Sequence, residues 1–381
     1  MERSQAMNAP SRPENSTTPK RLLKPTAWIV YLVIGFEILF MISPAALYFY
    51  SLYGPALNVL NRWEATAWLT QFFLPHISTT RSPVLNALPW IGGVFAVIGA
   101  AWFLASAGQL YWNKFRQKGL VTTGLYAFSR HPQYTALALL GLGTLLMWPR
   151  FLVLIAYVAM LFMYRYLAAL EERRCEAEFG QAYRDYQART PPILPFIPHS
   201  ADRGGHPRIG LGALGAVASI IAALLIGFGL REYTLSEITA VYPNRAAVLS
   251  PAPLSEEELL AAYRTALKNS EVPQLLARFG ADPLVVHVVP RDWHLADLPI
   301  NLEPGRGGHH TPANFDRRYY KILFSQARTH EKRAAGKDIV RSAYGVDSLL
   351  LVEVDIAAGK VTAIETPPAH VVWGDIPTPL F

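Results

Sequence analysis

Residues 134–167 read YTALALLGLGTLLMWPRFLVLIAYVAMLFMYRYL, and this stretch decides the fold class. It contains two apolar runs, 134–148 and 151–167, with only Pro149-Arg150 between them. Each run is slightly shorter than the roughly 20 residues that a membrane-spanning helix needs. We therefore expect a tight helical hairpin that crosses the membrane and returns.

Three further apolar stretches flank this hairpin in the sequence. They cover residues 27–50, 88–112 and 209–230. The first is too long for the core of a signal peptide and lacks a convincing cleavage site, so we expect it to remain as a span. The second is rich in small residues, including Gly92-Gly93 and Gly99, which let neighbouring helices approach closely. Between these two, residues 51–87 suggest an interfacial helix and a loop.

The bulk composition agrees with a membrane protein. Only 17% of the 381 residues are charged, whereas a soluble domain usually carries about a quarter. The net charge of +7 comes from basic residues beside the apolar runs, not from a basic face interleaved with aromatic residues, so we expect no nucleic-acid partner. The single cysteine, Cys175, excludes an intrachain disulfide and is best explained as a packing residue.

The distribution of Lys and Arg predicts how the chain is oriented. Five basic residues lie in the tail 1–24 and four in the loop 113–131, but only two in the longer segment 51–87. Short basic segments face the cytoplasm, so the tail, this loop and the arginine-rich segment 168–208 are predicted to be cytoplasmic. The fifth span must then carry the chain outward.

Residues 231–381 have the composition of a soluble α+β domain. Ser255 followed by three glutamates is a capping box that opens a helix to about Lys268. We expect a strand at 284–289, a long helix at 314–335, and a hairpin formed by 348–356 and 360–365. The sequence does not reveal what this domain does, although a protein partner is one possibility.

These observations predict an all-α multi-pass membrane protein of about five transmembrane helices with an appended C-terminal soluble α+β domain. The predicted parts are a disordered cytoplasmic tail (1–24), a membrane core of four spans with a cytoplasmic cap segment (25–208), the fifth span (209–230) and an extracytoplasmic domain (231–381).

The first segment that could carry chemistry is residues 119–134, GLVTTGLYAFSRHPQY, which leads into the hairpin. Pro132 disfavours the α-helical conformation at His131, so the helix is expected to begin at or just after Pro132. A cation and an imidazole then meet at the boundary of water and lipid. The simpler interpretation is that Arg130 reaches lipid phosphates and His131 is only a helix-entry residue.

The second segment, residues 171–186, reads EERRCEAEFGQAYRDY and follows the hairpin. If the helix continues through it, Glu172, Phe179, Tyr183 and Tyr186 fall on one stripe. A carboxylate beside three aromatic rings could bind a cation such as a sulfonium. Gly180 could instead break the stripe, and the segment could be an amphipathic helix in the headgroup zone.

Taken together, the two segments are more specific than either alone. Arg-His-Pro-x-Tyr before a short hairpin, followed by Glu-Glu-x(6)-Phe-Gly-x-x-Tyr-x-x-Tyr, resembles the isoprenylcysteine carboxyl methyltransferase family and the related membrane phospholipid methyltransferases. The resemblance covers about residues 85–197.

This resemblance implies a membrane-embedded S-adenosylmethionine site without a metal, and a lipophilic substrate that enters from the membrane. It implies Arg130 and Glu172 as the catalytic residues. It also implies a set of cofactor-binding residues: Leu120, Val121, Gly124, Tyr126, Arg130, His131, Pro132, Tyr134, Glu172, Phe179, Tyr183 and Tyr186.

The sequence departs from the family pattern at two places. Pro191-Pro192 stands where the family usually has Pro-Arg, and Gln133 replaces an apolar residue. Membrane sterol-type reductases, which use a nicotinamide cofactor, share the Arg-His-Pro-x-Tyr entry but usually have Asn at the position of Gln133 and lack the exit motif. A second alternative is that the spans only anchor a partner-binding C-terminal domain.

The C-terminal domain contains several histidines. His309-His310 lie in a Gly-rich loop, and His287 and His294 precede them. They do not have the spacing of a metal-binding motif. We therefore expect a solvated loop and no metal site there.

Overall fold

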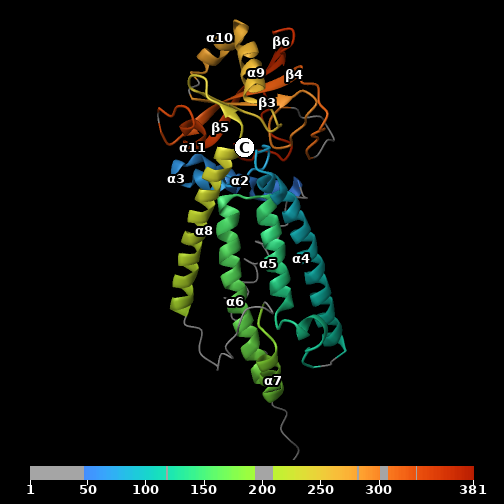
Figure 1. The fold of residues 1–381 in the computed structure, drawn as a ribbon. Helices are drawn as coiled ribbons and strands as arrows, with labels where there is room; N and C mark the ends of the chain where they lie inside the picture. The colour runs from blue at the N-terminus through green and yellow to red at the C-terminus, as the bar shows by residue number, and fades with distance from the viewer. Residues whose placement is uncertain (1–46, 117–118, 194–208, 281–282, 301–307, 332) are drawn as a thin grey trace, which may run out of the picture.

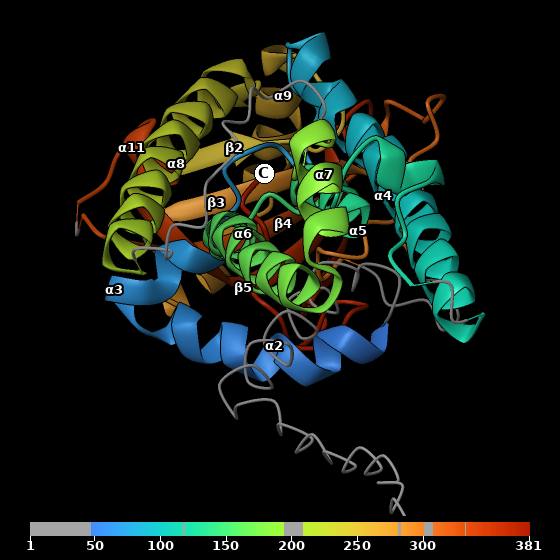
Figure 2. The same cartoon turned by 90° about the horizontal axis from the view of Figure 1, so that it is seen from below.

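The computed structural model describes residues 47–116, 119–193, 209–280, 283–300, 308–331 and 333–381. Its apolar helices α4, α5, α6 and α8 lie side by side, with a mixed α/β region at one end and the short helix α7 at the other (Figure 1). Seen along the bundle, α6 lies between α8 and α5 (Figure 2).

Within the part of the chain that the structure describes, three helices are long and apolar enough to cross a membrane. These candidate spans are Pro83–Asn113 in α4 (Pro83–Phe115), Phe151–Phe179, which is all of α6, and Gly212–Glu237 in α8 (Ile209–Glu237). The outward faces of α4 and α8 expose large apolar residues such as Trp90, Leu104 and Leu225. Such faces suit contact with lipid chains rather than water.

The predicted hairpin is present, although its first arm is short. Helix α5 (Pro132–Met147) is apolar but has only 16 residues, and α6 begins four residues later at Phe151. Helix α5 packs closely against α4 because glycines meet at the contact: a Cβ on Gly92 would lie 2.6 Å from the carbonyl oxygen of Gly143. The prediction that small residues bring neighbouring helices together is confirmed at this contact.

The structure does not confirm the count of five spans. The expected first span, 27–50, lies outside the described residues except for its last four, which belong to α2 (Leu47–Arg62). Helices α2 and α3 (Glu64–Ala67) lie at the sheet end of the bundle (Figure 1), followed by the 3-10 helix η2 (Trp68–Thr70). The predicted tail 1–24 also lies outside the described residues.

A connection of residues 71–82 joins these short helices to α4 and binds the C-terminal region. The amide of His76 donates to the carbonyl of the last residue, Phe381 (3.2 Å), and Thr79 donates to Pro251 (3.0 Å). Thr80 forms a β-bridge with Ile238. The C-terminal region is therefore hydrogen-bonded to the membrane region and is not merely appended to it.

Two buried arginines strengthen this junction. Arg150, at the turn of the hairpin, donates to the carbonyls of Thr70 and Pro377. Arg231 in α8 donates to Phe72 (2.6 Å) and lies over the ring of Phe381. Buried guanidinium groups are costly unless their donors are satisfied, and here carbonyl oxygens from both regions accept them.

The C-terminal region contains one six-stranded sheet in the order β1-β2-β3-β4-β5-β6. Only β2 and β3 pair in parallel; the other neighbours are antiparallel. The strands are β1 (Ala240–Val241), β2 (Ala246–Leu249), β3 (Leu284–Pro290), β4 (Tyr319–Thr329), β5 (Ala343–Asp355) and β6 (Lys360–Glu365). The helices are α9 (Glu256–Lys268), α10 (Glu271–Arg278) and α11 (Asp338–Ser342).

Several local predictions for this region are confirmed. Ser255 and Glu258 form both hydrogen bonds of the capping box at the start of α9. The strand predicted at 284–289 is β3, and the hairpin is β5 and β6, which turn at Gly359 with φ of +62°. A positive φ favours glycine because it has no Cβ to clash with the backbone.

The prediction of a long helix at 314–335 is wrong. This stretch contains β4, which pairs with β3 on one side and β5 on the other. Six consecutive residues of β4, 320–325, are buried, including Lys321. A central strand covered on both faces shows no alternation of polar and apolar residues, so the pattern that distinguishes a strand from a helix is missing here.

Candidate active site

The segment before the hairpin is held in place by the end of α4. The Gln109 side chain donates to the carbonyl of Thr123 (2.5 Å) and accepts from the amide of Leu125 (3.1 Å). Gly124 has φ of +62°, and a Cβ there would lie 2.7 Å from the Gln109 amide group. Only glycine fits this position, and it opens the 3-10 helix η3 (Gly124–Ala127), which carries the buried Tyr126.

Arg130, His131 and Pro132 form the entry to α5 as predicted. Pro132 is the first helical residue, and His131 has non-helical angles (φ −126°, ψ 61°). The amides of Arg130 and His131 donate to the carbonyls of Pro191 (2.9 Å) and Pro192 (3.1 Å). The carbonyl oxygens of these two prolines therefore accept hydrogen bonds that fix the backbone of the motif.

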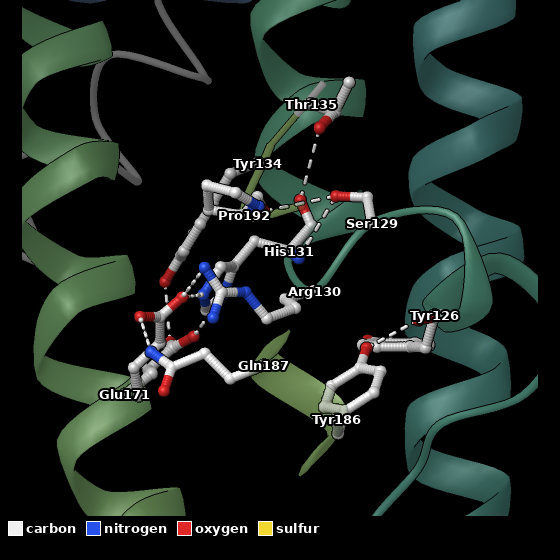
Figure 3. Close-up of polar contacts among 11 residues, drawn as sticks. Tyr126, Ser129, Arg130, His131, Tyr134, Thr135, Glu171, Tyr186, Gln187 and Pro192 are labelled. Atoms are coloured by element: carbon white, nitrogen blue, oxygen red, sulfur yellow. Dashed lines mark hydrogen bonds and ion pairs between the residues drawn. The ribbon is translucent and has the colours of Figure 1, made fainter. Parts of the chain in front are cut away.

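Arg130, His131, Glu171 and Glu172 form a compact ionic group, the Arg130 cluster, between the start of α5 and the lower part of α6 (Figure 3). One oxygen of Glu172 lies 3.2 Å from Arg130 Nη2 and 3.1 Å from His131 Nε2. His131 Nδ1 lies 3.4 Å from Glu171. The two motifs, distant in sequence, meet through these contacts.

Two neutral side chains complete the hydrogen bonds of this cluster. The Tyr134 hydroxyl donates to Glu171 (2.6 Å), and Gln187 of α7 (Gln181–Arg189) donates to the second oxygen of Glu172 (3.2 Å). The ring of Tyr134 also stacks on His131, with ring centroids 5.6 Å apart. Glu171 is thus held by two residues at the start of α5, and Glu172 by partners from the start of α5 and from α7.

The neighbouring carboxylates favour the charged form of His131. Burial lowers its pKa, but the adjacent carboxylates of Glu171 and Glu172 outweigh burial, and the net pKa is raised above the ordinary value. The imidazolium and the Arg130 guanidinium then balance two carboxylates. A charge-balanced cluster suits a role in positioning ligands.

The aromatic part of the second motif forms a cap. The continuous stripe does not form, and the alternative that Gly180 breaks it is confirmed, because α6 ends at Phe179 and Gly180 (φ +55°) starts a new helix, α7. Helix α7 nevertheless buries Tyr183 and Tyr186. Burial raises the pKa of Tyr186 to about 12, so its hydroxyl stays protonated and donates to the carbonyl of Tyr126 (2.5 Å).

The structure gathers the polar and aromatic members of the predicted site. Arg130, His131, Tyr134 and Glu172 are joined by the contacts above. Tyr126 and Tyr186 form a separate hydrogen-bonded pair, and Tyr183 packs edge-on against Tyr186. Pro132 is buried at the start of α5, while Leu120, Val121 and Phe179 are half-buried beside these segments. Sequence reasoning missed Gln109, Glu171 and Gln187; of these, only Glu171 carried a signal, as half of the Glu-Glu pair.

Arg130 still has donors to offer. Its Nε and Nη1 atoms are buried and have no hydrogen-bond partner among the described residues. Leaving a buried donor unsatisfied costs about 1–3 kcal/mol, and more when the group is charged. These two nitrogens therefore point to a ligand with an anionic group.

Comparison with known protein families tests the resemblance inferred from the two sequence motifs. Residues 83–182 match the family model described as phospholipid methyltransferase. This segment is therefore similar to the phospholipid methyltransferase family. It covers α4, the Arg130 cluster and the start of the aromatic cap, so the resemblance inferred from the two motifs is confirmed.

Two curated proteins are similar to parts of this chain. The cobalt-zinc-cadmium resistance protein CzcN of Cupriavidus metallidurans is 30% identical over 139 residues, which are 35% of this chain and 54% of that protein. The protein-S-isoprenylcysteine O-methyltransferase of Schizosaccharomyces pombe is 31% identical over 80 residues, which are 21% of this chain and 34% of that protein. The aligned regions thus span about half and a third of these relatives.

No solved structure matches the chain. The family match and the three apolar helices together indicate an integral membrane protein with a methyltransferase domain.

Proposed function

We propose that the chain transfers a methyl group from S-adenosylmethionine to a lipophilic or membrane-borne substrate at the Arg130 cluster. The observation that carries this proposal is the Arg130 guanidinium, which is buried, paired with Glu172 through Nη2, and free at Nε and Nη1 among the described residues. Charged donors on a buried guanidinium favour an anionic partner such as a carboxylate, and the methionine part of the cofactor carries one.

The other predicted residues fit the remaining parts of this cofactor. Tyr183 and Tyr186 are buried aromatic rings of α7, the helix that also brings Gln187 to Glu172. Aromatic rings near a carboxylate attract a cation such as a sulfonium. Gly124 is exposed and lies beside the Gln109 side chain, and Leu120 and Val121 precede it in the chain. When bound, the cofactor supplies an electrophilic methyl group.

The charge balance of the cluster bears on the kind of substrate. Glu172 is engaged by Arg130, His131 and Gln187, so it is poorly placed to remove a proton. A nucleophile that arrives already deprotonated, as a carboxylate does, needs no base. This favours an isoprenylcysteine-type carboxylate, the group implied by the name of the yeast relative. A lipid headgroup is the alternative.

The role of the protein is then to position the nucleophile and the methyl group and to exclude water. Methyl transfer requires the nucleophile and the methyl group in line, and α7 closes the cluster from the polar side through Gln187 and Tyr186. A lipophilic substrate would enter laterally from the membrane. Membrane lipids are the immediate surroundings of the exposed apolar faces of α4 and α8.

Binding of S-adenosylhomocysteine tests the cofactor directly. The purified full chain in detergent is expected to show a saturable rise in thermal midpoint with S-adenosylhomocysteine, because a ligand that binds the folded state stabilises it. NADPH is expected to cause no shift. A response to NADPH alone would replace the methyltransferase proposal with the sterol-type reductase.

We further propose that the Arg130 cluster faces the cytoplasm of an inner or plasma membrane and that the C-terminal region lies on the opposite side, where it could bind a protein partner. The cluster and the sheet lie at opposite ends of the helix bundle (Figure 1). Since basic residues concentrate around the cluster end, the rule that positive segments stay inside sets the orientation.

Cysteine labelling tests this orientation. In a Cys175→Ser background, Lys360→Cys on the exposed turn of β6 is expected to react with a membrane-impermeant maleimide in intact cells or spheroplasts. Arg116→Cys, at the end of α4 near the cluster, is expected to react only after lysis. Equal protection of both positions before lysis would show that α8 does not carry the chain outward.

A further inference from the structure

A second group of polar side chains lies at the sheet end of the bundle, far from the Arg130 cluster. It consists of His76, Asp297 and His309, which we call the His76 group. His76 comes from the connection 71–82, whereas Asp297 and His309 follow β3. One ligand atom from each residue lies within 4.8 Å of the others.

The geometry of the His76 group is unusual for a set of hydrogen bonds. Both histidines direct Nε2 to the same oxygen of Asp297, at 3.5 Å for His76 and 3.2 Å for His309. Charge-assisted hydrogen bonds between nitrogen and oxygen are typically about 2.7–2.9 Å long. The two imidazole nitrogens and the carboxylate oxygen therefore lie close together, but at distances longer than those of strong hydrogen bonds.

Two of these side chains are held in place before any ligand arrives. Asp297 and His76 are buried, with side chains 5% and 8% exposed. The His76 ring stacks on Phe72, with centroids 4.7 Å apart and planes at 11°. His309 is more accessible, at 39%. A rigid pair of ligands with one accessible ligand allows an ion to enter.

An open cavity of about 380 Å³ lies beside the group. His76 and His309 line it together with Pro75, Trp90, Trp293 and Thr311. Space next to the converging nitrogens leaves room for a water molecule or a small anion. Zinc sites with three protein ligands and one open position have this layout.

We infer that His76, Asp297 and His309 bind one divalent transition-metal ion of the zinc class, with its remaining coordination position facing the cavity. Two imidazoles and one carboxylate form a ligand set that suits Zn²⁺ and related ions. The ion would join the connection 71–82 to the C-terminal region, and so tie the membrane helices to the sheet. The sequence did not predict this site, because two of its three ligands, His76 and Asp297, lie outside the histidine-rich loop.

Metal binding requires one local change. His309 Nδ1 accepts a long hydrogen bond from the amide of Ala296 (3.3 Å). A neutral imidazole that ligates through Nε2 carries its proton on Nδ1. The Ala296 contact therefore opens as the ion binds, and the exposed His309 ring is free to turn.

Equilibrium dialysis and calorimetry with Zn²⁺ test the site in the full chain, purified in detergent without a histidine tag. One equivalent is expected to bind, and Co²⁺ is expected to give the visible absorption of a four- or five-coordinate ion. His76→Ala, Asp297→Asn and His309→Ala are each expected to weaken binding at least tenfold. His310→Ala is the matched control, because His310 is the exposed neighbour of His309 on the same loop and should bind as the unaltered chain does.

S-adenosylhomocysteine binding and the metal-free thermal midpoint show whether each variant is folded. His309→Ala alters the most exposed ligand, so it should leave both unchanged. If the unaltered chain binds no stoichiometric Zn²⁺, or if folded His309→Ala binds it as tightly, the three residues form only an ion-pair contact and the inference is wrong.

Discussion

Replacing Arg130 with alanine is expected to lower methyl transfer by about a hundredfold or more while leaving the protein folded. The change removes the ion pair with Glu172 and the two free guanidinium donors. A hydrogen bond to a charged group is worth about 1.5–3 kcal/mol, or roughly ten- to a hundredfold in binding. Loss of a contact to a ligand carboxylate together with loss of the ion pair to Glu172 is expected to exceed the effect of one hydrogen bond. A radiolabelled methyl-transfer assay with lipid extract as substrate measures the loss.

Two companion variants separate charge from geometry. Arg130→Lys keeps a cation but loses the planar fork, so we expect it to recover only part of the activity. Glu172→Gln removes the carboxylate that orients Arg130 and His131, and is expected to impair cofactor binding.

Arg184→Ala is the control for these variants. Arg184 lies on α7, close to the cap in sequence, but is exposed and pairs with Glu176 on the surface. Exposed pairs contribute about 0–1 kcal/mol, so this variant should keep its turnover. If Arg130→Ala retains full turnover at matched expression and thermal midpoint, the cluster does not hold the reacting molecules.

The membrane helices could be predicted from sequence because their signal is local. A run of apolar residues such as 151–167 must be helical wherever it meets lipid, since its backbone has no water to bond with. Pro132 marked the start of α5 for a similarly local reason. The structure adds that α6 continues to Phe179 and that Gly180 turns the chain.

The sheet was harder to predict because its pairing is long-range. β4 lies between β3 and β5, and both of its faces are covered, so neither alternation nor amphipathic periodicity identifies it. The Arg130 cluster shows the same limit. Its ionic residues could be predicted from the family motifs. Pro191 and Pro192 contribute only their carbonyl oxygens as hydrogen-bond acceptors, and no side-chain pattern predicts which backbone carbonyls accept.

The contact between α4 and α5 provides the second large expected effect. Gly92→Ala is expected to destabilise the protein by about 1–3 kcal/mol, the usual cost of overpacking a tight interface. The new methyl group would lie 2.6 Å from the carbonyl oxygen of Gly143 and 2.9 Å from Leu146 Cβ. Because both neighbours belong to α5, the two helices must separate. The thermal midpoint of purified protein in detergent measures the loss.

Gly93→Ala is a closely matched control, because it makes the same chemical change one residue further along α4. No atom lies within 4 Å of the position that its Cβ would occupy, so we expect an unchanged or slightly raised midpoint. The contact also reaches the active site, because α4 carries Gln109, which holds Thr123 and Leu125, while α5 begins directly after His131. Gly92→Ala should therefore lower methyl transfer together with stability, and Gly93→Ala should change neither. Equal midpoints for the two variants would mean that α4 and α5 are not packed as closely as the glycines indicate.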